Sequence, residues 1–255
     1  MSDLLKKLLS EGTIALGVWE TVYMTAISTA LAYLIGLPLG IILHVTDKGG
    51  LKPIGWLNKV LGAIVNVFRS IPFIILMVAC LPVAKAIVGT SLGNGAMIVM
   101  LVIAAAPYVA RMAESSLKEV DRGVIEAAEA MGANTFEIIF KVLLPEAKPA
   151  LIVGAVISAV TVLGYSAMAS TIGGTGLGAI AIVYGHQRFK DDVIWVCVVL
   201  IVLIVQITQE LGMLAARRAD KRLGGKRRKK SAKANIGTGD GTSAEGRAET
   251  SAEKR

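Results

Sequence analysis

The sequence predicts an all-α protein that spans a membrane five times. Of its 255 residues, 54% are hydrophobic and only 18% are charged, whereas ordinary soluble domains carry about 25% charged residues. The charges are also segregated, since none occurs in residues 21–43, 86–110, 149–187 or 193–209. A spanning helix needs only about 20 apolar residues. The composition therefore argues against a soluble enzyme, a disordered chain and a disulfide-stapled secreted domain.

Five apolar segments have the length of a membrane-spanning helix. They cover roughly Val22–His44, Leu61–Ile87, Gly95–Val109 with a few more residues at each end, Ala150–Thr171 and Val193–Ala216. Together they define a membrane domain over residues 21–216. Arg69 interrupts the second segment. Residues 1–20 are expected to be a short amphipathic lead-in, because Glu11 and Glu20 break the apolar stretch that a signal peptide would need.

The distribution of basic residues predicts the orientation of the chain. The linker 45–60, the loop 111–148 and the tail 217–255 fall on one side of a five-span protein, and they hold 21 of the 27 lysines and arginines. Cytoplasmic segments carry such an excess. We therefore expect this side to be cytoplasmic and the N-terminus to be extracytoplasmic.

The tail 217–255 changes character after Lys221. Lys226–Lys230 form a basic run, and beyond it small and polar residues dominate without apolar periodicity. Such a composition buries too little apolar surface to fold, so a disordered cytoplasmic tail is expected. Because the basic run follows a span directly, it is interpreted as an anchor on anionic membrane lipid, with no nucleic acid as a partner.

The cytoplasmic loop 115–146 between the third and fourth spans carries the clearest local signals. Asp121 predicts the N-cap of a first short helix, and Gly132 predicts its end. Asn134 predicts the cap of a second helix, with Glu137 in capping-box spacing. Pro145 is expected to end that second helix.

The first of these helices presents a surface suited to a partner. Val124, Ala128 and Met131 fall on one stripe at helical spacing, and Ala127 would let another backbone approach closely. Glu126 lies in the first turn and can accept a bidentate arginine from a partner. The alternative is an ordinary amphipathic helix that rests on the bilayer surface.

A longer pattern around this helix resembles the EAA signature of ABC importer permeases. It reads Glu126-Ala127-Ala128, three residues, Gly132, nine residues and Val142-x-Leu144-Pro145. One departure is Val142, where the family usually has isoleucine. The resemblance implies a type I ABC importer permease fold. It also implies that Glu126, Ala127, Ala128 and Gly132 belong to a coupling helix that docks on an ATP-binding subunit.

Three further segments narrow the resemblance to the permeases of methionine ABC importers. They are Gly17–Val22, Val65–Leu76 and Leu163–Met168, and the similarity runs from about Gly17 to Ala216. The family implies import of methionine in its L and D forms across the bacterial inner membrane. It also implies a permease homodimer, two ATP-binding subunits and an extracytoplasmic methionine-binding lipoprotein.

Several chemical signatures are missing from the sequence. Gly225-Lys226 is followed by arginine, so no phosphate-binding loop is present and ATP is expected to bind a partner chain. We find no catalytic grouping and no metal cluster, and we expect no cofactor. Cys80 and Cys197 lie in apolar runs, as small buried side chains do. The five-span unit is not repeated, so two copies are expected to enclose a pathway.

Four residues are candidates for that pathway. Arg69 lies deep in the second span, where a charge costs roughly 2.5–3.5 kcal/mol and normally faces protein or water. Pro72 would loosen the helix beside it. Tyr165, Ser166 and Met168 place two polar groups and a flexible thioether in the fourth span. The alternatives are that Arg69 reaches the cytoplasmic surface and that Met168 only fills a helix interface.

These features together predict the membrane subunit of an ATP-driven amino-acid importer, with methionine as the first candidate and another small amino acid as the alternative. A secondary transporter would need an acidic or cation-binding site inside the membrane, whereas Glu20 and Glu210 lie at predicted span ends. A membrane anchor or scaffold would need neither Arg69 nor a broken helix.

Overall fold

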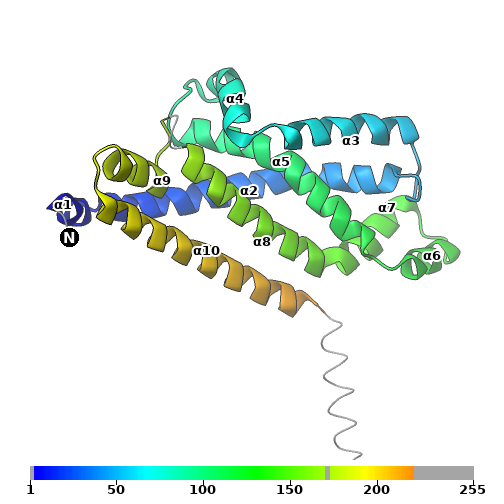
Figure 1. Ribbon diagram of the computed structural model, residues 1–255. Coiled ribbons are helices and arrows are strands. Elements are labelled where there is room, and N and C mark those ends of the chain that lie inside the picture. Colours follow the sequence, from blue (N-terminus) through cyan, green and yellow to red (C-terminus); the bar gives the residue numbers. More distant parts are fainter. Residues whose placement is uncertain (1–2, 170–172, 221–255) are drawn as a thin grey trace, which may run out of the picture. The chain divides into compact units, whose positions relative to one another are not determined.

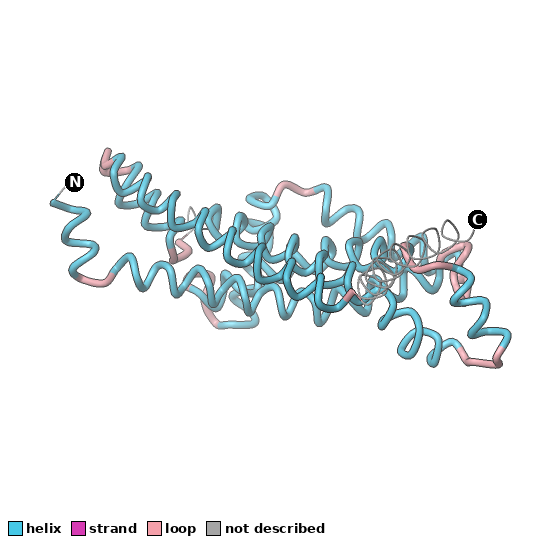
Figure 2. Tube along the Cα trace, turned by 90° about the horizontal axis from the view of Figure 1, so that it is seen from below, coloured by secondary structure: helices cyan, strands magenta, loops and turns pink. Residues whose placement is uncertain are grey.

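A computed structural model describes residues 3–169 and 173–220, and over this range it consists of helices joined by turns and short loops (Figure 1 and Figure 2). In chain order these are α1 (Asp3–Ser10), α2 (Thr13–Thr46), α3 (Gly55–Ser70), α4 (Phe73–Val88), α5 (Asn94–Lys118), α6 (Arg122–Ala130), α7 (Thr135–Glu137), a π-helical segment (Ile138–Leu143), α8 (Leu144–Ala169), α9 (Leu177–Ala179), a second π-helical segment (Ile180–His186) and α10 (Asp191–Ala219). The chain divides into two units, residues 1–216 and 217–255. Most of the second unit lies outside the described residues, and the predicted tail with Lys226–Lys230 is part of it.

The described helices account for the predicted spans. Four are long and apolar enough to cross a membrane: α2, α5, the continuous helix Thr135–Ala169, and α10. The bent pair α3 and α4 makes a fifth span when it is counted as one. The prediction of an all-α protein with five spans holds in this sense, although α5 continues to Lys118, farther beyond Val109 than the few residues predicted. The predicted end of the fourth span, Thr171, lies outside the described residues.

The second predicted span, Leu61–Ile87, is not one helix. It breaks at Ile71 and Pro72 into α3 and α4, whose axes differ by 110°. Ile71 adopts an extended conformation (φ −79°, ψ 125°), as the residue before a proline does, and Pro72 then caps α4. The sequence predicts that Pro72 loosens a single helix, whereas the structure shows a complete break that is much sharper than a bend.

Pro145 does not end the second helix of the loop, so this prediction is wrong. The helix that begins at Thr135 runs on to Ala169 through the π-helical segment Ile138–Leu143. In this wide turn the N–H of Leu144 donates to the carbonyl of Ile139, five residues back. Proline cannot donate a backbone hydrogen bond, and its ring clashes with the carbonyl of the preceding helical turn. A widened turn directly before Pro145 relieves this conflict, so the helix continues.

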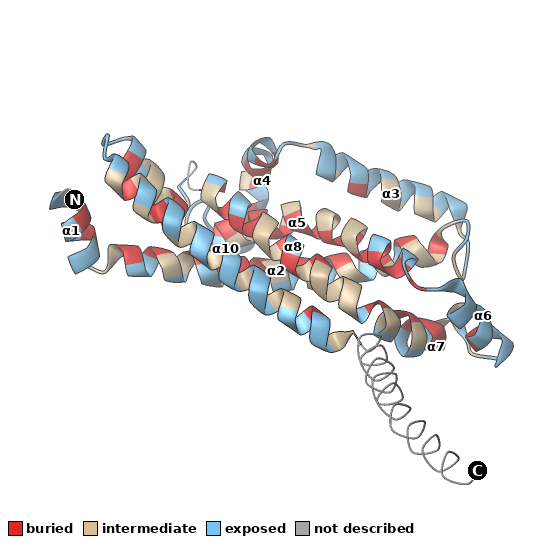
Figure 3. Cartoon of the chain, turned by 60° about the horizontal axis from the view of Figure 1, so that its bottom comes forward, coloured by how far each residue is buried: buried red, intermediate tan, exposed pale blue. Residues whose placement is uncertain are grey.

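The centre of the fold is the contact between α2 and α5. α5 is the most deeply buried of the long helices, whereas α10 shows mostly exposed residues (Figure 3). Gly36 and Gly40 lie on the buried side of α2. A Cβ on Gly40 would lie 2.5 Å from the carbonyl oxygen of Ala110 and 2.7 Å from the Cβ of Ala113. The backbones of α2 and α5 are therefore so close at Gly40 that no larger residue fits there without a shift.

Polar contacts join distant segments near the beginning of α2. The Glu20 carboxylate accepts a hydrogen bond from the Gly176 N–H at 3.0 Å and another from the Asn94 side-chain amide at 3.2 Å. Thr21 Oγ1 accepts a third, from the Leu177 N–H at 2.9 Å. α2 already begins at Thr13, so the helix extends into the predicted lead-in 1–20 and carries Glu20 to these partners.

We expect the Gly40→Ala variant to be less stable than the wild type by about 1–3 kcal/mol, because the new methyl group forces α2 away from α5. Gly62→Ala is the matched control: Gly62 lies inside α3, and its nearest contact to an added Cβ is 4.0 Å away. That change should be neutral or stabilising. Thermal unfolding of the detergent-solubilised proteins measures both, and equal midpoints would contradict the close contact.

Candidate functional site

Local hydrogen bonds define both ends of the helix α6, at the residues that the sequence predicts. At its start the Asp121 side chain accepts a hydrogen bond from the Gly123 N–H at 2.7 Å. At its end Gly132 has a φ of +81°, and the N–H groups of Gly132 and Ala133 donate to carbonyls of the last turn at 2.9 and 3.1 Å. These two bonds form a Schellman motif, which favours glycine at this position. Both predicted ends of the first loop helix are confirmed.

The second loop helix also begins as predicted. Asn134 Oδ1 accepts the Glu137 N–H at 2.9 Å, and Glu137 Oε2 accepts the Asn134 N–H at 3.1 Å. This reciprocal pair is a capping box. Lys141 pairs with Glu137 at 2.9 Å one turn later. The turn between α6 and α7 is therefore held on both sides by hydrogen bonds, so that the loop has a defined shape.

The four predicted coupling residues differ in exposure. Glu126, Ala127 and Gly132 are exposed. Ala128 is only 4% exposed, so it packs α6 against its own chain and forms the buried edge of the predicted stripe. Met131 is 81% exposed at the other edge. The surface that α6 offers to a partner thus centres on Ala127 and Met131.

Two aromatic residues extend this surface, and sequence analysis missed them. Phe136 and Phe140 are exposed, and their ring centroids lie 4.7 Å apart. Their spacing of four residues places both rings on one face of the helix, which is the signal that could have revealed them. Exposed apolar side chains gathered on one segment are typical of an interaction site.

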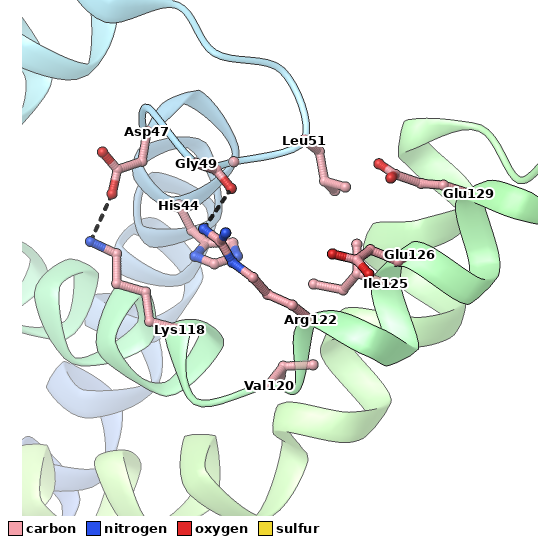
Figure 4. Close-up of a pocket in the computed structure, with 11 residues that line it drawn as sticks. His44, Asp47, Gly49, Leu51, Lys118, Val120, Arg122, Ile125, Glu126 and Glu129 are labelled. Carbon is pink, nitrogen blue, oxygen red and sulfur yellow. Dashed lines mark hydrogen bonds and ion pairs between the residues drawn. The ribbon is translucent and has the colours of Figure 1, made fainter.

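A cavity of about 440 Å³ separates α6 from the turn that follows α2. Figure 4 shows Glu126 and Glu129 on the α6 side, His44, Asp47 and Lys118 on the other side, and Arg122 between them. No described residue forms an ion pair with Glu126, so its carboxylate is available to an incoming cationic side chain.

A network of ion pairs and hydrogen bonds leads from this cavity to α3. Lys118 bridges Asp47 at 2.9 Å and Glu114 at 2.8 Å, and Glu114 also pairs with Arg111 at 2.6 Å. Arg111 in turn donates to Asn66 Oδ1 at 2.7 Å. The hydrogen bond from Lys118 lowers the pKa of the Asp47 carboxyl below its usual value. Glu114 was not singled out from the sequence. The signal that could have revealed it is the position of Arg111 three residues before it and Lys118 four residues after it, which places all three side chains on one face of a helix.

The predicted pathway residues are only partly brought together. Arg69 and Tyr165 line one cavity of about 250 Å³. The Tyr165 ring stacks on Phe73, with centroids 4.3 Å apart and planes 5° from parallel. Ser166 is buried and donates to the Leu163 carbonyl within its own helix, so it does not line this cavity. Met168 is 51% exposed and lies outside the cavity lining as well.

Within the described ranges, no three His, Cys, Asp or Glu side chains are grouped so that they could hold a metal ion. Cys80 and Cys197 are buried free thiols. Two cavities in the described part of the chain carry charged side chains: the mixed-charge cavity between α6 and the turn after α2, and the aromatic cavity lined by Arg69 and Tyr165.

Comparisons with known proteins agree with this arrangement. The "probable D-methionine transport system permease protein MetI" of Vibrio cholerae is 51% identical over 204 residues, which cover 80% of this chain and 91% of the relative. The "methionine import system permease protein MetP" of Bacillus subtilis is 49% identical over 204 residues, covering 80% and 92%. A solved inward-facing structure of the MetNI methionine ABC transporter matches with a TM-score of 0.82 and 44% identity, covering 87% of this chain and 100% of that one.

The family described as "binding-protein-dependent transport system inner membrane component" matches residues 36–224, a range that contains α6, the mixed-charge cavity and the aromatic cavity. From this match, together with the identity to its relatives, we conclude that the chain belongs to the family of binding-protein-dependent transport system inner membrane components.

Proposed function

We propose that this chain is the permease subunit of an ATP-driven importer for methionine, in its L and D forms. Two copies form the pathway, two copies of a separate ATP-binding subunit drive it, and an extracytoplasmic methionine-binding lipoprotein delivers the substrate. The names of the relatives from Vibrio cholerae and Bacillus subtilis support this substrate. The observation that carries the proposal is the capped, exposed helix α6 with the Glu126-Ala127-Ala128 and Gly132 pattern.

The continuous helix Thr135–Ala169 provides a mechanical link for this function. α6 contacts the π-helical segment Ile138–Leu143 at the base of this helix. Tyr165 lies near its other end, about 45 Å from Thr135 at 1.5 Å per residue. When ATP binding closes the ATPases, α6 moves with them and displaces the helix base. The pathway then opens outward, and hydrolysis returns it to the inward state.

A secondary transporter is the alternative from a different class, and it would need an acidic group inside the membrane. Sequence analysis considered only Glu20 and Glu210. The structure adds Glu114 in α5, but this carboxylate is paired with both Arg111 and Lys118 and is therefore neutralised. A permease for another small amino acid is the closer alternative, and competition experiments separate it from a methionine permease.

The proposed function is tested by uptake into proteoliposomes that contain the permease, its ATP-binding subunits and its binding protein. We expect labelled methionine to accumulate only with ATP inside, and vanadate to stop accumulation. Unlabelled D- and L-methionine should compete more strongly than other amino acids. Accumulation driven by an ion gradient without ATP would contradict the proposal.

Replacement of Gly132 tests the coupling role of the loop. Valine at a φ of +81° is strained by roughly 1–2 kcal/mol or more, so Gly132→Val should distort the turn after α6 and reduce both ATPase binding and uptake. Gly132→Asn is the matched control, because asparagine tolerates this conformation, and it should retain more of both. Normal transport by the valine variant would argue against coupling through this turn.

The proposed orientation places the loop 115–146 in the cytoplasm and the N-terminus outside. In a background with both natural cysteines replaced by alanine, Ala130→Cys should react with a membrane-impermeant maleimide only in inside-out vesicles. Thr90→Cys, between α4 and α5, should react only in intact spheroplasts. Both positions are exposed, so access to the reagent depends on the side of the membrane. The reverse labelling pattern would overturn the orientation.

A further inference from the structure

Arg69 is a charged side chain without a partner among the described residues. No ion pair or hydrogen bond connects it to residues 3–169 or 173–220. Arg111, by contrast, pairs with Glu114 and donates to Asn66, and Arg122 donates to the Gly49 carbonyl. A cation in a membrane-spanning segment is costly unless it faces water, protein dipoles or an anion. An unpaired guanidinium that lines a cavity is therefore a site for an anionic ligand.

The cavity beside Arg69 combines this charge with aromatic surface. Its other lining residues come from the four helices α3, α4, α5 and α8 and from the break, and they include Phe68, Phe73, Tyr108 and Tyr165. None of the lining residues is acidic. Its volume of about 250 Å³ is just below the roughly 300–1,000 Å³ of pockets for drug-sized ligands, so it suits a smaller molecule.

The break between α3 and α4 adds a second electrostatic feature to the same cavity. Ile71 and Phe73 at the break line it together with Arg69. The last carbonyls of α3 and the first N–H groups of α4 lack partners within their own helices. Helix C-termini favour cations and helix N-termini favour anions. Broken helices therefore suit a ligand with both charges, as they do at the centre of other transporters.

We propose that this cavity holds the transported amino acid during its passage, with the α-carboxylate on the Arg69 guanidinium and the apolar side chain against the stacked rings of Phe73 and Tyr165. The carbonyl end of α3 faces the α-ammonium group, which explains how the site accepts a zwitterion without an acidic residue. This assignment rests on the proposed function as an amino-acid importer. It predicts recognition of the carboxylate by the permease itself.

A phospholipid headgroup is the other source of an anion for Arg69. Arg69 lies about 21 Å along the α3 axis from Gly55, at 1.5 Å per residue. Tyr108, which lines the same cavity, lies in the middle of the long helix α5. Both placements put the guanidinium far from the cytoplasmic headgroups. The amino-acid carboxylate is therefore the favoured ligand, and the experiment separates the two.

The test uses the permease assembled with its ATP-binding subunits in nanodiscs of pure phosphatidylcholine. The probe is photo-methionine, a diazirine analogue that keeps the α-carboxylate and α-amino groups. On illumination it loses N₂, and the resulting carbene inserts into a nearby bond. We expect mass spectrometry to find the label on peptides that contain Phe73, Tyr108 or Tyr165. Excess L-methionine should abolish labelling, whereas L-methioninol, which lacks the carboxylate, should compete at least about tenfold less well.

Substitutions at Arg69 complete the test. Arg69→Gln should lower labelling of the cavity about tenfold or more, and Arg69→Lys should retain an intermediate level because its positive charge remains. Lys85→Gln is the matched control, since it removes an exposed positive charge of α4 outside the cavity. Labelling in this control should equal that of the wild type.

The outcomes distinguish this inference from the proposed function. If the wild-type complex with its binding protein imports no methionine, both fail. If it imports methionine but Arg69→Gln is labelled like the wild type, or methioninol competes as well as methionine, only the carboxylate site is overturned. The same holds if anionic lipid added to the nanodiscs abolishes labelling, because a headgroup phosphate then occupies Arg69 in place of the carboxylate.

Discussion

The close approach of α2 and α5 is the constraint on which the other features depend. Inside a bilayer, helices gain little from hydrophobic association and are held by tight packing and polar contacts. Gly36 and Gly40 allow this packing because neither has a side chain: Gly36 lies against Ala106 and Val109, and Gly40 lies against Ala110 and Ala113. With α5 fixed against α2, the helices α3, α4 and α8 pack on α5, and the ends of α5 carry polar groups to both sides of the fold.

Two prolines show how the fold uses the same residue in opposite ways. Pro72 follows an extended Ile71 and separates α3 from α4, which creates the cavity beside Arg69. Pro145 follows a π-helical turn and leaves the helix continuous from Thr135 to Ala169. Pro72 thus interrupts a span beside the cavity, whereas Pro145 is accommodated within a continuous helix that contributes Tyr165 to the same cavity. The difference lies in the turn before each proline.

Local features were the most predictable part of the structure. Asp121, Gly132 and Asn134 act through neighbours a few residues away, so their caps and turns follow from the sequence. The meeting of Arg69 and Tyr165 could not be derived, because it depends on how four helices pack and on the 110° break. The sequence likewise indicated apolar spans but not the widened turn before Pro145, since periodicity does not distinguish an α-helical turn from a π-helical one.

The hydrogen bonds of Glu20 also bear on how the protein is made. Glu20 and Thr21 bind Gly176 and Leu177, which the ribosome adds 156 residues later. α2 therefore enters the membrane while its carboxylate still lacks these donors, and it obtains them only after α8 has been synthesised. Contacts this distant in sequence form late because the intervening chain must be in place first. These hydrogen bonds therefore join the beginning of α2 to the chain after α8 at a late stage of biogenesis, when only the residues beyond Leu177, with α10 among them, remain to be added.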